Sequence, residues 1–163
     1  MAEGNREAPI ATPTVTVSPR LVLLRAKASS AEEVIRALAA RLEEEGFVRP
    51  SFVNAVLNRE RTNPTGLPLA GDLHVAIPHA EVEHVIAPAL AIAILEQPVA
   101  FRNMVNPEEI VPASVVIVMA LNEPHGQIEM LQRLAELFQD PDRIRRIYEA
   151  RSPEEVIERL GLP

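Results

Sequence analysis

Two apolar runs, Ala89–Leu95 and Ser114–Leu121, restrict the fold more than any other feature of this 163-residue chain. Both are rich in Ala, Val and Ile and show no regular alternation of polar and apolar residues. Strands with this pattern are covered on both faces, as in the interior of an α/β sheet. Both runs are far shorter than the ~20 residues that span a bilayer. We therefore expect two central strands with helices on both faces of the sheet, and no direct membrane insertion.

The flanking segments predict the rest of such a sheet and its helices. Ser30 followed by Glu33 is typical of a helix start, and Gly46 is typical of the end of that helix. The other predicted elements are helices at 51–60, 127–138, 140–148 and 153–160 and strands at 21–24, 73–77 and 98–101. Strands mixed with helices along the chain indicate an α/β protein, a three-layer α/β/α sandwich with a small mixed sheet of four to five strands.

The composition narrows the function classes and the organisation of the chain. The formal net charge of −7 opposes nucleic-acid binding, which requires clustered Lys and Arg. The chain has no cysteine, which excludes a disulfide, a thiolate metal site and a cysteine nucleophile. Residues 1–18 lack both helical periodicity and a signal-peptide pattern. We expect a flexible leader over 1–18 and one domain over 19–163, located in the cytoplasm.

His79 follows a short strand-like segment and a proline, in Val75-Ala76-Ile77-Pro78-His79. Proline cannot donate to a sheet ladder, so strand pairing should stop at Pro78. His79 would then lie at a strand end, where loops carry chemistry. This placement suits an imidazole that another molecule must reach.

His74, His79 and His84 follow one another at intervals of five residues, which raises the question of a metal site. Five residues along a strand turn a side chain to the opposite face, and on a helix they rotate it by about 140°. We therefore expect no metal site, and we interpret His74 and His84 as structural histidines. The sequence also lacks the common signatures of serine hydrolases, phosphate-binding loops, dinucleotide-binding folds and zinc proteases.

The residues around His79 resemble a known family. Asn63-Pro64-Thr65-Gly66-Leu67-Pro68-Leu69, followed by the His79 segment, is similar to the active-site segment of enzyme IIA components of the sugar phosphotransferase system, of the fructose/mannitol type. Arg59-Glu60 matches the Arg-Glu pair at the end of the preceding helix in that family. Residues 123–131, with Pro124-His125, resemble its second-histidine segment, and the galactitol-specific branch looks most similar.

This resemblance implies a phosphotransferase component that works without a cofactor. His79 would accept a phosphoryl group from the histidine-containing phosphocarrier protein and pass it to a cysteine of a IIB component, during uptake of a galactitol-like sugar. A neutral imidazole is a competent nucleophile, and its phosphoramidate is reactive enough to hand the group on. Since this chain has neither cysteine nor a membrane-spanning run, the IIB cysteine and the IIC permease would lie elsewhere.

The resemblance also implies roles for neighbouring residues. Arg59 would clamp the phosphoryl oxygens, and His125, at a helix start, would stabilise the group. Glu60 would orient Arg59 or a histidine tautomer, and Thr65 and Gly66 are candidates for phosphate contact. Each also has an ordinary structural interpretation: a solvated helix-end charge for Arg59, a helix-start residue for His125 and a simple turn for Thr65-Gly66.

One position departs from the family pattern, and one alternative function stays open. Residue 80 is Ala where relatives usually carry Thr or Gly, so Ala80 removes a hydroxyl that could contact the phosphoryl group. The alternative to a transport component is a regulatory IIA-like module whose phosphorylation state controls protein partners. Such a module would be phosphorylated on His79 but would not deliver phosphate to a IIB component.

Overall fold

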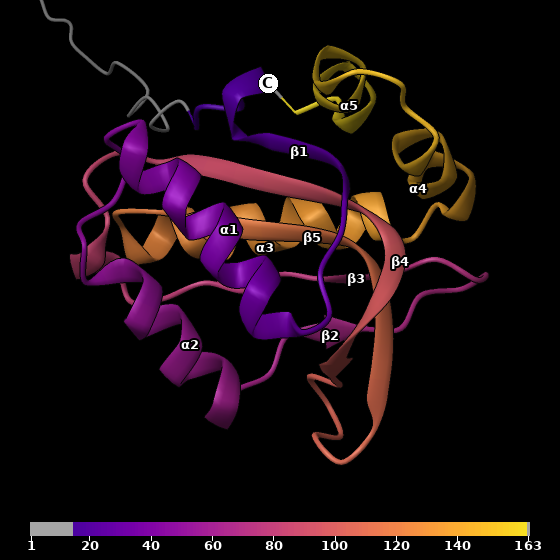
Figure 1. Ribbon diagram of the computed structural model, residues 1–163, viewed down its shortest axis with the longest axis horizontal. Coiled ribbons are helices and arrows are strands. Elements are labelled where there is room, and N and C mark those ends of the chain that lie inside the picture. The colour runs from indigo at the N-terminus through magenta and orange to yellow at the C-terminus, as the bar shows by residue number, and fades with distance from the viewer. Residues whose placement is uncertain (1–14, 163) are drawn as a thin grey trace, which may run out of the picture.

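The computed structural model describes residues 15–162, which form a five-stranded mixed sheet in the order β1-β4-β5-β3-β2 (Figure 1). The strands are β1 Val22–Ala26, β2 Gly66–Leu67, β3 His74–Ala76, β4 Ala89–Arg102 and β5 Ile110–Ala120. β1 and β4 run parallel, as do β3 and β5, whereas the pairs β4–β5 and β2–β3 are antiparallel. The expected mixed sheet is therefore confirmed.

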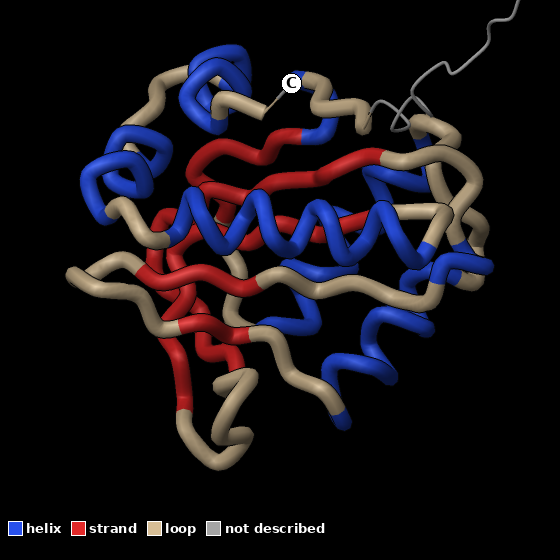
Figure 2. The backbone as a smooth tube through the Cα atoms, turned by 180° about the vertical axis from the view of Figure 1, so that it is seen from behind, coloured by secondary structure: helices blue, strands red, loops and turns tan. Residues whose placement is uncertain are grey.

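Helices cover both faces of this sheet. They are α1 Ala31–Glu44, α2 Phe52–Thr62, α3 Pro124–Phe138, α4 Pro141–Tyr148 and α5 Pro153–Leu160, with short 3-10 turns η1 Pro19–Leu21 and η2 Val82–His84. α1 and α2 contribute to one hydrophobic cluster, and α3, α4 and α5 contribute to the other. Figure 2, from behind, shows α3 lying across the sheet on the face opposite α1. This arrangement confirms the three-layer α/β/α sandwich. Between residues 15 and 162, no helix is long and apolar enough to cross a membrane.

The two apolar runs form the centre of the sheet, as predicted. β4 and β5 pair from Ala89↔Ala120 to Arg102↔Ile110, and all side chains of 89–95 and 115–121 are buried. The segment Pro98–Phe101, expected as a separate strand, is the second half of β4. A register shift between Ile94 and Val99 explains this difference, because an irregularity there accommodates the exposed Pro98 without ending the strand.

The predicted start of the first helix is present with one change in its hydrogen bonds. The Ser30 hydroxyl accepts from the Glu33 N–H at 3.2 Å, as in a capping box. The Glu33 carboxylate, however, accepts from the N–H and the hydroxyl of Ser29 rather than from Ser30, each at 2.9 Å. Gly46 ends this segment with φ +85°, a conformation that favours glycine.

Most of the expected leader, residues 1–14, lies outside the described residues. Its last part is in contact with the domain: the Thr16 N–H donates to the Pro88 carbonyl at 3.0 Å, and Val15 and Val17 pack against the α3–α5 cluster. Ser18 caps η1 by accepting from the Arg20 N–H. The start of the domain at residue 19 stays a prediction.

Candidate functional site

His79 lies just beyond β3, at the carboxyl end of the neighbouring β5. The regular ladder of β3 ends at Ala76, but the Pro78 carbonyl still accepts from the Met119 N–H at 3.0 Å. The proline therefore removes a donor without ending the contact between the two segments. His79 is held against Met119 and is only 7% exposed, so less of it is accessible than its place at a strand end suggested.

One hydrogen bond fixes the tautomer of the His79 ring. Its Nδ1 lies 2.9 Å from the Ile77 carbonyl oxygen. A carbonyl can only accept, so Nδ1 carries the proton in the neutral ring. The lone pair is consequently on Nε2, the nitrogen on the opposite side of the ring, which makes no hydrogen bond to another described residue.

The surroundings of His79 favour this neutral ring. Burial lowers the pKa of His79 below its ordinary value of 6.5, and the positive charge of Arg59 lowers it further. The hydrogen bond to Ile77 and the negative charge of Glu81 act in the opposite direction. The net effect is a lowered pKa, which favours the neutral ring with its lone pair on Nε2.

Arg59, in the last turn of α2, makes an ion pair that the sequence did not reveal. Its Nη1 donates to Glu81 Oε2 at 3.0 Å, although 22 residues separate the two. Hydrogen bonds from its own backbone N–H and from Arg59 lower the pKa of Glu81. The Nε of Arg59 is buried and has no hydrogen-bond partner among the described residues. The guanidinium thus has donor capacity left beside His79.

Glu60 holds the loop that follows α2 rather than holding Arg59. Its two carboxylate oxygens accept from the N–H and from the hydroxyl of Thr65, each at 2.9 Å. Burial raises the pKa of Glu60, and the two bonds from Thr65 oppose that effect. The Thr65 carbonyl in turn accepts from the Ile77 N–H at 3.3 Å, two residues before His79. Glu60 is therefore linked through Thr65 to the segment that leads to His79, and the Thr65 hydroxyl proton is already donated.

Gly66 has a packing reason to be glycine. A Cβ built there would lie 2.6 Å from the Arg102 carbonyl oxygen and 3.1 Å from the Val111 Cβ. The Gly66 carbonyl also accepts from the Met104 N–H at 2.9 Å. The residue thus lets β2 lie directly against the β4–β5 hairpin, and it does not line the cavity beside His79.

A largely apolar cavity, which we call the His79 cavity, opens beside His79. Its volume is ≈ 480 Å³. It is lined by Arg59, Asn63, Pro64, Thr65, Leu67, Ile77, His79, Met104, Leu131, Ala135 and Phe138. The structure thus brings Arg59, Thr65 and His79 together, as the resemblance implied. Met104, which follows β4, also lines this cavity but was not predicted as a site residue. Nothing in its local sequence indicates which part of the fold it packs against.

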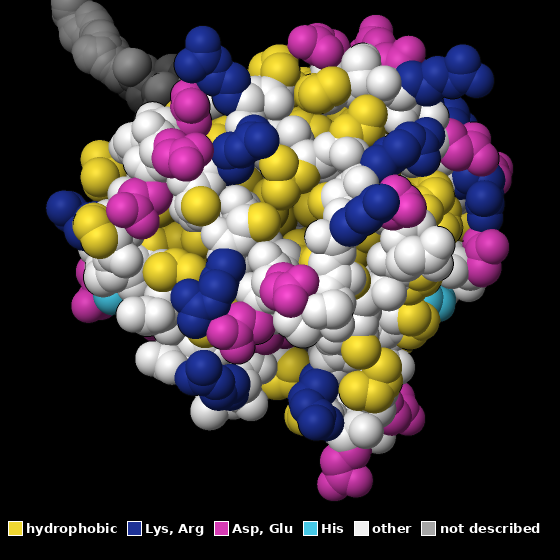
Figure 3. All heavy atoms as spheres, in the orientation of Figure 1, with side chains coloured by type: hydrophobic (Ala, Val, Ile, Leu, Met, Phe, Trp, Pro, Cys, Tyr) yellow, Lys and Arg dark blue, Asp and Glu magenta, His cyan; other side chains and the backbone are white. Residues whose placement is uncertain are grey.

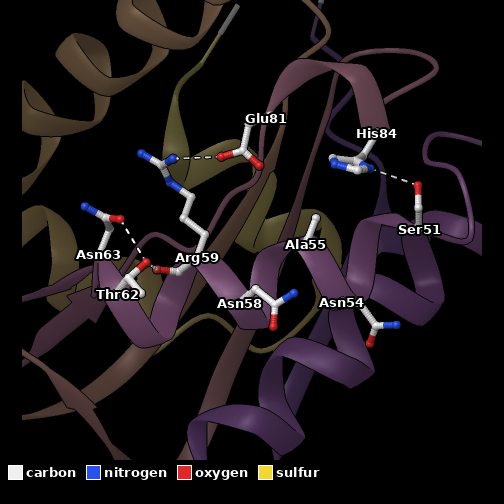
Figure 4. A pocket seen from close by; sticks show the side chains of 9 residues that line it. All are labelled: Ser51, Asn54, Ala55, Asn58, Arg59, Thr62, Asn63, Glu81 and His84. Carbon is white, nitrogen blue, oxygen red and sulfur yellow. Dashed lines mark hydrogen bonds and ion pairs between the residues drawn. The ribbon is translucent and has the colours of Figure 1, made fainter.

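A second hollow, which we call the polar groove, meets the His79 cavity at Arg59 and Asn63. It has a volume of ≈ 580 Å³ and runs along α2 towards η2. Figure 4 shows its lining, with Arg59 turned towards Glu81 at one end and His84 turned towards Ser51 at the other. The amide side chains of Asn54 and Asn58 lie between these two pairs, and the Thr62 hydroxyl lies beside Asn63 at the Arg59 end.

His125 lies in the first turn of α3, where the sequence placed it, but it does not line the His79 cavity. Its side chain is exposed and makes no hydrogen bond within residues 15–162. The nearby Gln127 instead contacts the segment that carries His79, because its Nε2 donates to the Ala80 carbonyl at 2.8 Å. Ala80 is buried, so the structure leaves little room for a larger side chain at that position.

The other two histidines of the five-residue series each have a structural hydrogen bond. His74 Nδ1 accepts from the Leu69 N–H at 2.9 Å, and His84 Nδ1 lies 2.9 Å from the Ser51 hydroxyl oxygen. Among the described residues, no group of three or more His, Cys, Asp or Glu side chains is arranged to hold a metal ion.

Comparisons with known proteins find relatives over most of this chain. The mannitol-specific phosphotransferase enzyme IIA component of Halalkalibacterium halodurans is 28% identical over 148 residues, which cover 89% of this chain and 94% of that protein. The galactitol-specific EIIA component of Escherichia coli K12 is also 28% identical, but over 110 residues, 68% of this chain and 72% of that protein. The match to a mannitol-specific component is therefore longer than the match to the expected galactitol branch.

Solved structures share the fold and most of the length. The complex of enzyme IIAMtl and phosphorylated enzyme IIBMtl from Escherichia coli has a TM-score of 0.74 and 29% identity, covering 91% of this chain and 99% of the matched chain. Multi-component relatives are longer: the mannitol-specific EIICBA component of Escherichia coli K12 is 30% identical over 86% of this chain but only 21% of its own length. Residues 16–161 match the family model described as phosphoenolpyruvate-dependent sugar phosphotransferase system, EIIA 2. Because this match extends over nearly the whole chain, the protein belongs to the EIIA 2 family of the sugar phosphotransferase system.

Proposed function

We propose that this protein is a phosphocarrier, which accepts a phosphoryl group on His79 Nε2 from the histidine-containing phosphocarrier protein and passes it to a cysteine of a IIB component. The observation that carries the proposal is the Nδ1–H tautomer of a mostly buried His79 beside Arg59. A histidine with one fixed tautomer and a lowered pKa presents a single nucleophilic nitrogen.

The chemistry needs no general base. The Nε2 lone pair forms a bond to phosphorus as the P–N bond of the donor phosphohistidine breaks, and the released electron pair stays on the donor ring. The Nδ1 proton remains on His79, bonded to the Ile77 carbonyl. In the second step a IIB thiolate attacks phosphorus, and the electron pair of the breaking P–N bond returns to Nε2.

Arg59 supplies the positive charge that this transfer needs. Negative charge spreads over the equatorial oxygens in a loose transition state, so donors matter more than acid–base groups. In the unphosphorylated protein one nitrogen of Arg59 pairs with Glu81. We propose that the guanidinium exchanges Glu81 for the phosphoryl oxygens, and that Glu81 recovers it when the group leaves.

The remaining site residues take less direct roles in this proposal. Glu60 orients the Thr65 loop through its two hydrogen bonds. Thr65 offers its hydroxyl oxygen only after giving up one of these bonds, and Gly66 contributes its backbone. His125 stabilises the phosphoryl group during transfer to the partner in this proposal, and the support is that its side chain is exposed and so can be reached by a docked protein.

For the transported substrate we propose a hexitol, with a mannitol-type system favoured over a galactitol-type one. The support is the greater coverage of the mannitol-specific relatives. A IIB partner is supported by the matched complex, whose two components are IIAMtl and phosphorylated IIBMtl.

Phosphorylation in vitro tests the proposal. The protein is incubated with labelled phosphoenolpyruvate, enzyme I and the phosphocarrier, and we expect one acid-labile phosphoryl group. His79→Ala should take up no label, whereas the control His74→Gln, which keeps an acceptor for Leu69, should be labelled normally. Label on His79→Ala would show that the nucleophile is another residue.

A IIB component from the same organism then separates transport from regulation. Label should move from His79 to IIB, and His125→Ala should slow this step more than it lowers the amount of phosphoprotein. A phosphoprotein that transfers nothing to any IIB component would favour the regulatory alternative. An unchanged transfer rate in His125→Ala would show that His125 is structural.

A further inference from the structure

A third hollow lies on another part of the molecule, where the end of β1 meets α4 and α5. Its volume is ≈ 410 Å³, and its lining is Arg25, Tyr148, Glu149, Arg151 and Arg159. It shares no lining residue with the His79 cavity or with the polar groove. Since β4 and β5 separate β1 from β3, the strand carrying Arg25 and the strand leading to His79 lie roughly 14 Å apart. We call this hollow the arginine pocket.

Arg25 has a strained backbone in this pocket. Its φ is +53°, and it is the one non-glycine residue with positive φ in the described part of the chain. It lies where the pairing of β1 with β4 shifts register, between Leu23 and Ala26. An irregularity of this kind redirects a side chain, and a long side chain in the left-handed region has an energetic cost. Glycine would avoid that cost. We therefore attribute the arginine at this position to its side chain and not to the backbone conformation.

The charges of the pocket are unbalanced. Within residues 15–162, the side chains of Arg25 and Arg151 make neither a hydrogen bond nor an ion pair. Arg159 is held in place, because its Nη1 donates to the Arg146 carbonyl at 2.6 Å and its Nη2 lies 3.6 Å from the Glu155 carboxylate. The acidic member of the lining, Glu149, is 3.9 Å from Arg145.

The walls of the pocket are fixed by bonds that do not use the guanidinium groups of Arg25 and Arg151. The Tyr148 hydroxyl donates to the Leu95 carbonyl at 3.2 Å, which attaches the end of α4 to β4. The Arg151 backbone N–H donates to Glu155 Oε1 at 2.7 Å, so its side chain projects from a fixed point just before α5. Figure 3 shows Lys and Arg side chains over α4 and α5, interspersed with Asp and Glu side chains, so the excess of arginine belongs to the pocket lining and not to the whole surface around it.

We propose that the arginine pocket binds the phosphate group of a small molecule, either a phosphate monoester or a free diphosphate. Guanidinium groups match phosphate oxygens in geometry and charge. The volume is of the size of small-molecule sites. An extended polyanion is disfavoured, because α5 carries Glu154, Glu155 and Glu158. This proposal does not depend on the chemistry of His79.

Calorimetric titration of the full chain with inorganic pyrophosphate and with glucose 6-phosphate tests the proposal. We expect binding of at least one ligand, weakened about tenfold or more in the double variant Arg25→Gln, Arg151→Gln. Arg36→Gln, which changes an exposed arginine paired with Glu32 on α1, should bind as the unmodified protein does. His79→Ala should also bind normally, which separates this site from the phosphoryl site. The ligand that binds distinguishes an ester from a free diphosphate.

Arg25→Gly tests whether the strained backbone at Arg25 is kept for ligand binding and not for the stability of the fold. This variant should raise Tm by about 2–4 °C, because glycine accepts positive φ, and should still weaken ligand binding. The proposal is overturned if neither ligand binds at about 10 mM, if the double variant binds as well as the unmodified protein, or if single-stranded DNA binds more tightly than either ligand.

Discussion

The two hollows that meet at Arg59 differ in chemistry. The polar groove presents hydroxyl and amide groups of α2 together with Glu81 and His84, and it holds one nitrogen of Arg59 in an ion pair. The His79 cavity is lined mainly by apolar side chains from β2, α3 and the loop that follows β4. Arg59 and Asn63 line both hollows.

This difference indicates how one site can both hold charge and receive a protein. In the polar groove, the ion pair with Glu81 gives the Arg59 guanidinium a partner, so its charge is not left unpaired. On the apolar side, exclusion of water keeps the His79 ring neutral and offers a surface that a partner protein can cover. Substitutions made in the polar groove alone or in the His79 cavity alone should therefore separate effects on phosphoryl transfer from effects on partner docking.

The largest effect is expected from the polar side. Arg59→Gln keeps a polar side chain but removes the charge and the guanidinium group, and it should slow phosphorylation of His79 by about 10²–10³-fold at saturating phosphocarrier. The measurement is a rapid-quench time course with labelled phosphocarrier. Arg61→Gln is the matched control, because Arg61 is on the same helix but lines neither the His79 cavity nor the polar groove. Equal rates for the two variants would show that Arg59 is only a helix-end charge.

The next effect tests whether the apolar side depends on the close approach of β2 to the hairpin. Gly66→Ala would place a methyl group 2.6 Å from the Arg102 carbonyl oxygen, so it should lower the free energy of unfolding by about 1–3 kcal/mol. Gly126→Ala is the control, since its Cβ would meet Leu121 at 3.8 Å. Urea unfolding gives both values. A stable Gly66→Ala protein with impaired phosphorylation would instead favour phosphate contact at Gly66.

A smaller effect should follow from changing the apolar wall itself. Leu131→Asp places a charge in the surface that a partner would cover, and it should raise the KM for the phosphocarrier about tenfold while leaving the saturated rate nearly unchanged. Gln132→Asp adds the same charge to the same helix outside the cavity and should have little effect. If both variants raise KM equally, the cause is the net charge and not the cavity.

The sequence predicted the parts of this site that depend on local order. Arg59 ends a helix, Thr65 lies in the turn that follows it and His79 ends a short strand, so one continuous segment delivers all three. The contacts of Glu81 and Met104 could not be predicted, because each depends on how a loop packs against a distant element. The same applies to Glu60, whose neighbour in sequence is Arg59 but whose hydrogen-bond partner is Thr65.

The fold shows the same division between local and long-range information. Buried strands and capped helices were recognisable because apolar runs and capping residues act locally. The sequence did not show that β4 continues through Pro98, because this continuity depends on a register shift against β5. His125 was placed correctly at the start of α3. That it does not line the His79 cavity depends on how α3 packs on the sheet, which the local sequence does not show.

The smallest expected effect concerns pH, and it tests whether the apolar side sets the charge of His79. Burial lowers the pKa of His79 below 6.5, so the unfolded chain binds more protons than the folded protein just below that pH. The free energy of unfolding should therefore fall as the pH decreases through 6.5 and should level off once folded His79 is protonated. Urea unfolding from pH 7.5 to 5 measures this slope, which His79→Gln should remove.

NMR titration of the ring should show His79 changing charge below 6.5, and Leu131→Asp should move this transition upwards because it brings water and negative charge to the cavity. A His79 that titrates at or above 6.5 in the unmodified protein would contradict the proposed role of the apolar wall.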